Sequence, residues 1–543
     1  MRALTLMALL LAACDTATSD ECVPAQSCGC PDGQTGAQVC AQAEAAGCVC
    51  SAAPDAALDA RPDDARPSQD AVANDLGLPD PPDAAPPQHD AAVPDAAVPL
   101  GGFRGNVILG TPTGQSIRAN IYAAEDRGTV TVVFGPVGGA QRRSPAQAVV
   151  PGEPVEVLLE GLTPDTAYRY HLDFVAADGL GSGPTADSTF RTARPAGAPF
   201  TFCIQGDSHP ERPNEFDPAL YTRTLQTAAA DQPDFYLTLG DDFSVDAIDP
   251  ADINAERVAE RYVVQRPYLS IVGRSAPVFL VNGNHEQAAG YLYDGTAENI
   301  PVWAQTARNR LYAQPAPDDF YTGNDTPLPH VGLVRNYYAF TWGDALFVTL
   351  DPYWPSDVSV SAPYGGGMPN TNVWAVTHGD AQLQWLERTL RESTARFKFV
   401  FAHHVMGTGR GGVEVANLGE WGGENRNGTN GFAQNRPEWE APIHALFVET
   451  GVTIFFQGHD HLWVHQALDG VTYQTLSEPA DPNYAYPQWA DAYLSGDILP
   501  SSGYARVAVT PDAVQVEYVR TYLPADEGPE RVSGAVAFRY TVR

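Results

Sequence analysis

Five short apolar runs beyond residue 199 each end in polar side chains of the kinds that bind metal ions. An unbroken apolar run of this length is typical of a strand that is buried on both faces of a sheet. In open α/β sheets, ligands bind at the carboxyl ends of the strands. We therefore expect the polar side chains that follow the runs to meet at one edge. The runs are residues 200–205, 235–239, 278–281, 398–401 and 453–456.

The polar residues after these runs form a set of metal-ligand type. Carboxylate, amide and imidazole groups suit Zn, Fe or Mn, and no thiolate stands among them. One carboxylate can give an oxygen to each of two metals. Two metals about 3.5–4 Å apart can activate a bridging water and bind a phosphate for in-line displacement. The sequence therefore predicts a centre of two divalent or trivalent ions, with the ligands Asp207, His209, Asp241, Asn284, His403, His459 and His461.

The same residues resemble the motifs of a known superfamily, the calcineurin-like metallophosphoesterases. The pattern of that superfamily is Asp-x-His, Gly-Asp, Gly-Asn-His-(Asp/Glu), His and Gly-His-x-His. It is matched by residues 207–209, 240–241, 283–286, 403 and 458–461. The resemblance implies an α/β fold over residues 197–543, a four-layer α/β/β/α sandwich. It also implies hydrolysis of a phosphate ester by a hydroxide that bridges the two metals.

The resemblance implies a role for each matching residue. His285 would not bind metal; it would hydrogen-bond a phosphoryl oxygen or protonate the leaving group, which is a general-acid role. Asp241 would bridge the metals. One metal would take Asp207, His209, Asp241 and His461, and the other would take Asp241, Asn284, His403 and His459.

Further residues are candidates for substrate binding. His404 stands beside His403 and is expected to line the catalytic pocket, and Asn284 is expected to contact substrate as well as metal. The Gly-rich stretch that follows contains Arg410 and Arg426. Either arginine could bind a phosphate through its forked guanidinium, and Arg410 is our preferred candidate. The alternative is a surface loop with solvated arginines.

Residues 101–196 alternate in short β-type runs separated by turn residues, which predicts an all-β sandwich. The segment 161–170 resembles the tyrosine corner of fibronectin type III domains, in which a Tyr hydroxyl bonds back to the backbone. Such a domain before a phosphoesterase resembles the layout of purple acid phosphatases. That family has Gly in place of His209 and Tyr in place of Ser244. We therefore expect no iron–tyrosinate, and the metal pair stays open.

The N-terminal residues predict export. Residues 1–13 form a short signal peptide, and Leu11-Ala12-Ala13-Cys14 resembles the lipobox of bacterial lipoproteins, whose Cys carries acyl chains. The alternative is a plain signal peptide with a chance Cys. Besides Cys14, the segment 14–50 contains six cysteines, from Cys22 to Cys50, which indicate three disulfides with 15 possible pairings; a zinc knot is the alternative. Residues 51–100, rich in Ala, Asp and Pro, predict a disordered linker.

The net charge of −34 argues against a nucleic-acid partner, because binding of the phosphate backbone needs a basic surface. An anionic substrate must therefore be captured by a local positive site. We expect an exported, lipid-anchored enzyme that faces the periplasm or the cell exterior and hydrolyses small phosphate monoesters. The alternatives are a phosphodiesterase or nucleotidase and a non-catalytic, metal-containing surface binding protein. The oligomeric state stays open.

Overall fold

The computed structural model describes residues 102–543, without 360, 363–367, 370–371 and 406–409, and three short strands nearer the N-terminus. The chain divides into two units, residues 1–86 and 87–543. In the first unit, an antiparallel sheet consists of β1 (Ser27–Gly29), β2 (Thr35–Gln38) and β3 (Cys48–Val49). The expected signal peptide, Cys14 and the linker lie outside the described residues, as do the side chains of the expected disulfides. These assignments stay predictions.

The second unit begins with a β-rich region of two facing sheets. One sheet has the order β4-β5-β9, and the other is built around β10 and β6. Alternate residues of β10 are buried, which is the pattern of a strand with one face on a core. The strands are β4 (Gly105–Gly110), β5 (Ser116–Ala123), β6 (Gly128–Pro136), β7 (Arg142–Arg143), β8 (Gln147–Val149), β9 (Val155–Glu160), β10 (Ala167–Ala176), β11 (Gly183–Pro184) and β12 (Ser188–Arg191).

The hydrogen bond expected of a tyrosine corner is present in this region. The backbone N–H of Thr163 donates to the hydroxyl of Tyr168 at 2.8 Å. Tyr168 itself is buried in the core between the two sheets. The region is therefore an all-β sandwich with this local feature, and its assignment as a fibronectin type III domain stays a prediction.

A six-stranded sheet of mixed direction follows. Its order is β15-β14-β13-β28-β29-β30, with β13, β14 and β15 parallel and the remaining pairs antiparallel. The free thiol of Cys203 is buried in β13, as expected of a small core residue. The strands are β13 (Phe200–Gln205), β14 (Phe235–Thr238), β15 (Val278–Leu280), β28 (Gly503–Val509), β29 (Val514–Arg520) and β30 (Val536–Val542).

A second, eight-stranded sheet has the order β16-β19-β20-β23-β24-β26-β25-β27, and β20, β23, β24 and β26 run parallel. Its strands are β16 (Thr322–Gly323), β19 (Tyr338–Trp342), β20 (Ala345–Thr349), β23 (Phe397–Phe401), β24 (Ile454–Gln457), β25 (Trp463–Leu468), β26 (Val471–Thr475) and β27 (Asp497–Leu499). Two small ribbons stand apart, β17 (Pro327–Leu328) with β18 (Gly332–Leu333), and β21 (Ser361–Ala362) with β22 (Met368–Pro369).

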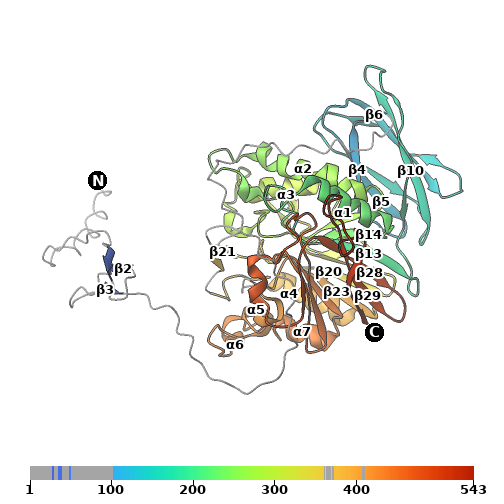
Figure 1. The fold of residues 1–543 in the computed structure, drawn as a ribbon. Coiled ribbons are helices and arrows are strands. Elements are labelled where there is room, and N and C mark those ends of the chain that lie inside the picture. Colours follow the sequence, from blue (N-terminus) through green and yellow to red (C-terminus); the bar gives the residue numbers. More distant parts are fainter. Residues whose placement is uncertain are drawn as a thin grey trace, which may run out of the picture. The chain divides into compact units, whose positions relative to one another are not determined.

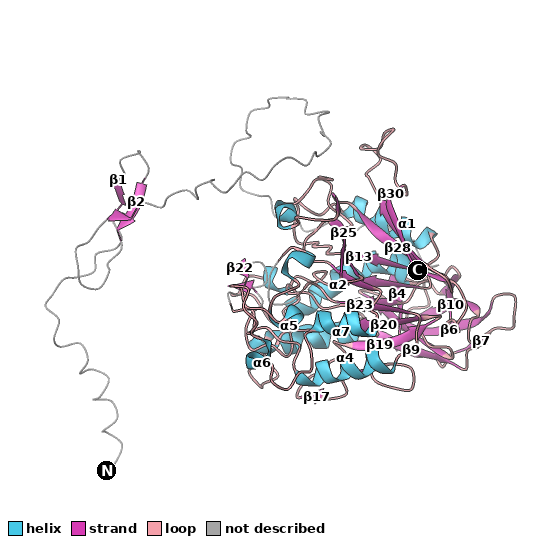
Figure 2. Ribbon diagram, turned by 90° about the horizontal axis from the view of Figure 1, so that it is seen from below, coloured by secondary structure: helices cyan, strands magenta, loops and turns pink. Residues whose placement is uncertain are grey.

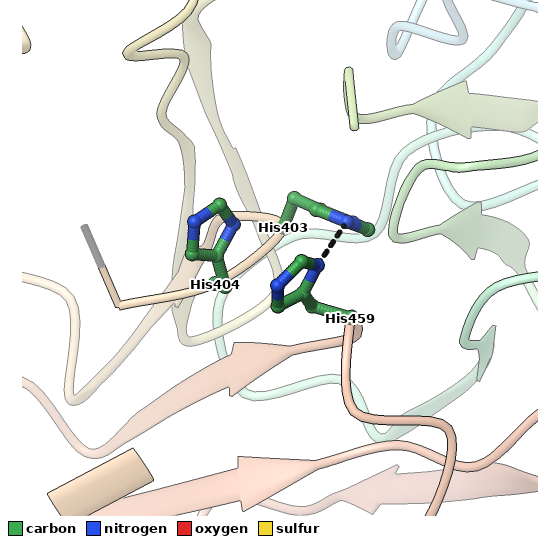
Figure 3. A group of neighbouring side chains, drawn as sticks. All are labelled: His403, His404 and His459. Atoms are coloured by element: carbon green, nitrogen blue, oxygen red, sulfur yellow. Dashed lines mark hydrogen bonds between the residues drawn. The ribbon is translucent and has the colours of Figure 1, made fainter. Parts of the chain in front are cut away.

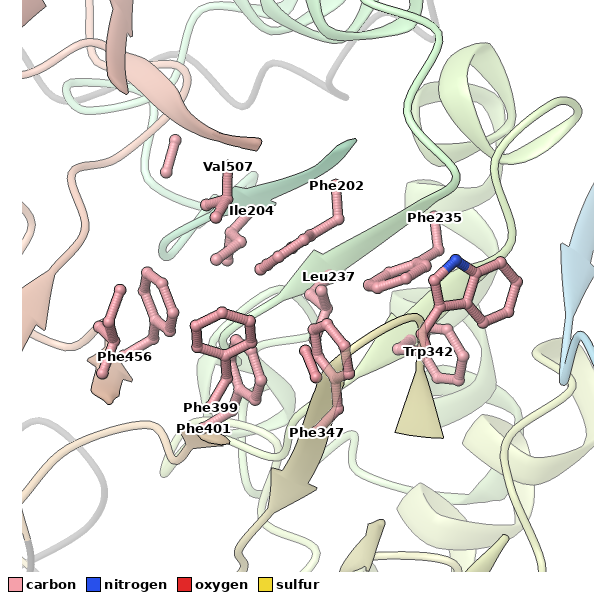
Figure 4. Close-up of a cluster of buried hydrophobic side chains, with 14 of the residues drawn as sticks. Phe202, Ile204, Phe235, Leu237, Trp342, Phe347, Phe399, Phe401, Phe456 and Val507 are labelled. Carbon is pink, nitrogen blue, oxygen red and sulfur yellow. The ribbon is translucent and has the colours of Figure 1, made fainter. Parts of the chain in front are cut away.

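The two large sheets pack face to face over an aromatic core. Phe202 and Phe235 from the first sheet meet Phe347 from the second, with ring centroids 5.1 Å apart in both pairs and the rings nearly perpendicular. Edge-to-face packing of this kind is a favoured arrangement of aromatic rings. Figure 4 shows Phe399, Phe401 and Phe456 extending the same layer. This core holds the two sheets in a fixed relation.

Helices cover the outer faces of the two sheets (Figures 1 and 2). Apolar residues of α1, α2 and α3 pack on the six-stranded sheet, and those of α4 and α7 pack on the eight-stranded sheet. The expected four-layer α/β/β/α sandwich is therefore confirmed. The helices are α1 (Pro218–Ala230), α2 (Ala255–Gly273), α3 (Ile300–Leu311), α4 (Asp380–Glu392), α5 (Gly419–Gly422), α6 (Phe432–Asn435) and α7 (Ile443–Thr450), with 3-10 turns η1 (Val245–Ala247), η2 (Gly290–Leu292), η3 (Gly412–Val415) and η4 (Gln488–Ala492).

The β-rich region is joined to helix α2 by a buried arginine. Arg266 donates through Nε to Asn106 Oδ1 at 2.8 Å, and through Nη1 and Nη2 to the side chain and backbone oxygens of Asn120 at 2.9 and 3.0 Å. The hydroxyl of Tyr170 donates to the backbone oxygen of Arg274 at 2.7 Å. These bonds fix the β-rich region against the outer helical layer. In the part of the chain that is described, no helix is both long and apolar enough to cross a membrane.

Candidate metal centre

The expected ligands lie in the loops that follow five strands, and these strands belong to two sheets. The loops after β13, β14 and β15 carry Asp207 and His209, Asp241, and Asn284 with His285. The loops after β23 and β24 belong to the other sheet and carry His403, His404, His459 and His461. The expectation of one shared sheet edge is corrected in this respect: the edges of two packed sheets face each other across the site.

The backbone at the site adopts conformations that are costly for side chains with a Cβ atom. Residues His209, Asp241, His459 and His461 have φ angles of 42°, 57°, 69° and 59°. Each such left-handed residue costs about 1–3 kcal/mol and persists only where the surrounding structure imposes it. The turns place these four side chains toward a common centre, so the strain accompanies a functional arrangement.

Each of the two aspartates is held by a backbone N–H, with the shortest bond to Oδ1. His285 N–H donates to Asp241 Oδ1 at 2.8 Å, and His459 N–H donates to Asp207 Oδ1 at 2.8 Å. Glycines make this approach possible, because a Cβ atom at Gly283 or Gly458 would overlap these Oδ1 atoms. The Oδ2 atoms therefore face the imidazoles.

The first group of ligands surrounds Asp207 Oδ2. This oxygen lies 3.3 Å from His461 Nε2 and 3.8 Å from His209 Nε2. Asp241 Oδ2 lies at the same 3.8 Å from His209 Nε2. A metal about 2.1 Å from two ligand atoms at the tetrahedral angle places those atoms about 3.4 Å apart, so distances of 3.3 and 3.8 Å suit ligands that share one ion.

The second group lies on the other side of Asp241. Asp241 Oδ2 is 2.9 Å from His403 Nε2, which also lies 3.0 Å from Asn284 Oδ1 and 3.2 Å from His459 Nδ1 (Figure 3). His403 Nδ1 faces the backbone oxygen of Leu239 at 2.8 Å and carries its proton there. Several acceptor atoms thus converge on His403 Nε2, an arrangement that a cation would stabilise. Asp241 lies between both groups, as a bridging ligand must.

The site fits a pair of metal ions by a second criterion. His209 is buried, and its Nε2 has no hydrogen-bond partner among the described residues. A buried unpaired nitrogen is unfavourable, and this one points at the two aspartate oxygens. The nitrogen and oxygen donors suit Zn, Fe or Mn. The seven expected ligands are therefore brought together in a possible binuclear site.

Outward-facing acceptors orient three of the histidines. Glu211 Oε1 lies 2.9 Å from His209 Nδ1, Glu478 Oε1 lies 3.0 Å from His461 Nδ1, and Asp246 Oδ2 lies 2.6 Å from His285 Nδ1. Such carboxylate partners fix the tautomer of a metal-binding imidazole and raise its basicity. Ser244 Oγ, at the position of the purple acid phosphatase Tyr, lies 3.3 Å from His209 Nδ1.

Charges in the centre compensate one another. Burial opposes ionisation of Asp207, but the imidazoles of His403 and His461 lower its pKa to about 2. Burial opposes the charged form of His403, but Asp241 and Asp207 raise its pKa to about 9. Likewise, Glu478 and Asp207 raise the pKa of buried His461 to about 10. Metal ions would compete with these imidazole protons, so binding would release protons.

His404 and Arg410 have partners of their own. His404 stacks on His459 with ring centroids 4.2 Å apart, and its Nδ1 lies 3.1 Å from the Tyr353 hydroxyl. Arg410 pairs with Asp460 at 2.9 Å and lies over the ring of Trp489 at 3.9 Å. The structure thus places His404 beside a ligand, and it engages Arg410 in contacts within the protein.

Sequence reasoning missed Arg212. Its Nη2 lies 3.2 Å from His285 Nε2, so the guanidinium lies at the edge of the metal centre. It also missed Glu211 and Glu478. The signal for Glu211 and Arg212 was their place directly after the Asp-x-His motif. Glu478 follows β26, beside β24 in the sheet, and only the sheet order brings it to His461.

The comparisons with known proteins agree with this geometry. Residues 200–462 match the family of calcineurin-like phosphoesterases. They form a calcineurin-like phosphoesterase domain. Every expected metal ligand, from Asp207 to His461, lies inside the matched residues of this phosphoesterase domain. No curated protein matches the chain.

Two solved structures resemble the chain beyond the phosphoesterase domain. One is purple acid phosphatase PPD1 from yellow lupin (Lupinus luteus) seeds, at 14% identity and a TM-score of 0.53; the likeness covers 80% of this chain and 73% of that one. The other is PhoD, at 15% identity and a TM-score of 0.57, covering 81% of this chain and 90% of that one. These shares exceed what residues 200–543 alone could supply. The two likenesses therefore show the fold of the β-rich region together with that of the phosphoesterase domain.

Proposed function

We propose that the protein is a two-metal phosphoesterase that hydrolyses small phosphate monoesters. The observation that carries the proposal is the position of Asp241 Oδ2 between two groups of donors, 3.8 Å from His209 Nε2 and 2.9 Å from His403 Nε2. A bridging carboxylate between two nitrogen-rich groups is the arrangement that holds two metals. The metal pair would supply Lewis-acid chemistry, drawing charge from the phosphoryl oxygens and lowering the pKa of water.

The chain's own residues would bind the substrate and move its protons. His285 is oriented by Asp246 through Nδ1, so its Nε2 is directed toward the centre, 3.8 Å from Asp241 Oδ2. Burial opposes protonation of His285, but Asp241 and Asp246 raise its pKa. A charged imidazole there can donate a proton to the leaving oxygen, as general acids do. His404, stacked on His459, would form part of the pocket wall.

The test is hydrolysis by the full chain after loading with Mn, Zn or Fe in turn. An aryl phosphomonoester and a bis-aryl phosphodiester are compared, with Asp241→Asn alongside. We expect turnover of the monoester and its loss in the variant. Turnover of the diester alone would indicate a phosphodiesterase, and retained turnover in Asp241→Asn would overturn the two-metal mechanism. Binding of two metals without turnover of either ester would favour a metal-containing binding protein.

We also propose that the chain is exported and anchored to a bacterial membrane by acyl chains on Cys14. The support is the sequence Leu11-Ala12-Ala13-Cys14 at the end of a short apolar segment. Acylation would bury CH₂ groups in the bilayer at about 0.8 kcal/mol each. Labelling with a radioactive fatty acid in a bacterial host tests this. Label should be incorporated in the natural chain and be absent from Cys14→Ser.

A further inference from the structure

Arg212 lies at the edge of the metal centre and is held there by acids on two sides. Its Nη1 pairs with Glu215 Oε2 at 3.1 Å, and its Nε lies 3.5 Å from Glu211 Oε1. These contacts direct Nη2 to His285 Nε2, at 3.2 Å. Because a guanidinium only donates, His285 Nε2 accepts this bond, and a phosphoryl group placed between the two would face the guanidinium on one side and the protonated imidazole on the other. An arginine so held needs little reorganisation to bind a ligand.

The electrostatic setting calls for a cation at this position. The chain carries a net charge of −34, and the acids Asp241 and Asp246 lie beside His285. The metal pair would offset the ligand acids, and Arg212 adds a further positive charge on the side where Asp246 faces His285. Arg212 is 29% exposed in its side chain, so it can meet a ligand that comes from solvent.

Arg410 is the arginine that the sequence favoured for phosphate binding, but its contacts are with other groups of the protein. It pairs with Asp460, donates to the backbone oxygen of His459 and covers the ring of Trp489. These contacts use both its charge and its flat face within the protein. Binding a phosphate would require Arg410 to leave Asp460 as a buried carboxylate, which is costly.

We propose that Arg212 binds the phosphoryl group beside His285 and gives the site its preference for monoesters over diesters. A monoester carries two negative charges at neutral pH and a diester carries one, so a facing guanidinium attracts the monoester more strongly. The guanidinium can also form paired hydrogen bonds with phosphoryl oxygens. This inference rests on the proposed function and specifies its substrate class.

The test compares Arg212→Ala and Arg212→Lys with a matched control in the full, metal-loaded chain. Arg223→Ala is the control, because Arg223 has the same 29% side-chain exposure and forms a single ion pair, with Glu527. We measure kcat/KM for an aryl phosphomonoester and a bis-aryl diester. Metal content and the melting temperature are measured on every variant. Arg212→Lys keeps the positive charge but loses the forked guanidinium, so it should retain part of the kcat/KM that Arg212→Ala loses.

We expect Arg212→Ala to lower kcat/KM for the monoester by about 10–100-fold, the loss of a charge-assisted hydrogen bond, mainly through KM. The kcat/KM for the diester should fall less, so the ratio of the monoester kcat/KM to the diester kcat/KM should decrease. Arg223→Ala should change neither. Equal losses for both esters, or no loss, at unchanged metal content would overturn the proposal.

A binding measurement separates this inference from the proposed function. Inorganic phosphate is titrated into metal-loaded natural chain, Arg212→Ala and Arg223→Ala by calorimetry. We expect weaker phosphate binding in Arg212→Ala alone. If the natural chain hydrolyses neither ester, the proposed function fails while the phosphate titration still decides the role of Arg212. Equal phosphate affinity in all three proteins would reject that role even in an active phosphatase.

Discussion

Asp207 and His459 are joined by a hydrogen bond across 252 residues of chain, from the backbone N–H of His459 to Asp207 Oδ1. The two residues follow strands of different sheets, β13 and β24. The bond therefore ties the ligand loop of one sheet to that of the other and turns Asp207 Oδ2 to the centre. Gly458 permits it, because a side chain there would occupy the place of Oδ1.

Gly458→Ala should disable the centre. Its Cβ would displace Asp207, and a ligand shift of about 1 Å can lower activity by about 100-fold. We expect reduced metal content, measured by elemental analysis, and a matching loss of ester hydrolysis. Gly528→Ala is the control, because a Cβ there meets no atom within 4 Å. Full metal content in Gly458→Ala would contradict the explanation.

Glu478 should act on metal affinity through His461. Removing a carboxylate that orients a metal-binding histidine lowers affinity by about 10–100-fold. We expect this loss for Glu478→Ala in a zinc titration of metal-free protein. Glu478→Gln keeps an acceptor for His461 Nδ1 and should recover part of the affinity. An equal zinc affinity in all three proteins would show that Glu478 serves only the fold.

His285→Ala should have an effect that depends on the leaving group. A general acid contributes about 10²–10⁴-fold when the leaving oxygen needs a proton. We therefore expect a large loss of kcat for an alkyl phosphate and a small loss for a nitrophenyl phosphate, whose leaving group departs as an anion. Similar losses for both esters would assign His285 to phosphate binding instead.

Arg266→Met should weaken the attachment of the β-rich region. The change leaves Asn106 and Asn120 without their buried donor, at a cost of about 1–3 kcal/mol for each unsatisfied group. Urea unfolding should show a lower midpoint, and limited proteolysis should cleave faster near residue 196. Arg257→Met, in the exposed ion pair with Glu260 on the same helix, should change neither. Unaltered proteolysis of Arg266→Met would contradict a fixed attachment.

Glu420 should contribute stability that depends on pH. Burial opposes its ionisation, but His378 and Arg436 lower its pKa below the ordinary value of 4.5. Because the folded pKa is lowered, the contribution is complete above about pH 4.5 and is lost as the pH falls through the folded pKa. Glu420→Gln should lower the melting temperature at pH 7 and reduce the difference from the natural chain in acid. A constant difference at all pH values would exclude this linkage.

The strands and the convergence of the ligands could be predicted from the sequence. The buried apolar runs indicate the strands, and the polar residues that follow them indicate where the ligands meet. The run at 200–205 is β13, with unchanged bounds. The division of the five strands between two sheets could not be predicted, because a fully buried strand has the same apolar pattern in either sheet.

The residues that the arginines contact could not be predicted from the sequence either. Arg410 stands in a Gly-rich segment that permits solvent exposure or burial, and only the fold places Asp460 and Trp489 around it. Arg266 carries no local pattern that distinguishes it from a surface arginine, and Arg212 has only its place shortly after the Asp-x-His motif. Their roles arise from tertiary contacts with His285 and Asn120, whose positions depend on other strands.

The division of the ligands between two sheets has a consequence for how the protein acquires its metals. Asp207 and Asp241 are synthesised long before His459 and His461, so no early portion of the growing chain contains either complete ligand group. Tight binding must wait until both sheets have docked. The identity of the ions that bind would thus depend on the metals present where folding is completed, and less on those present where translation begins.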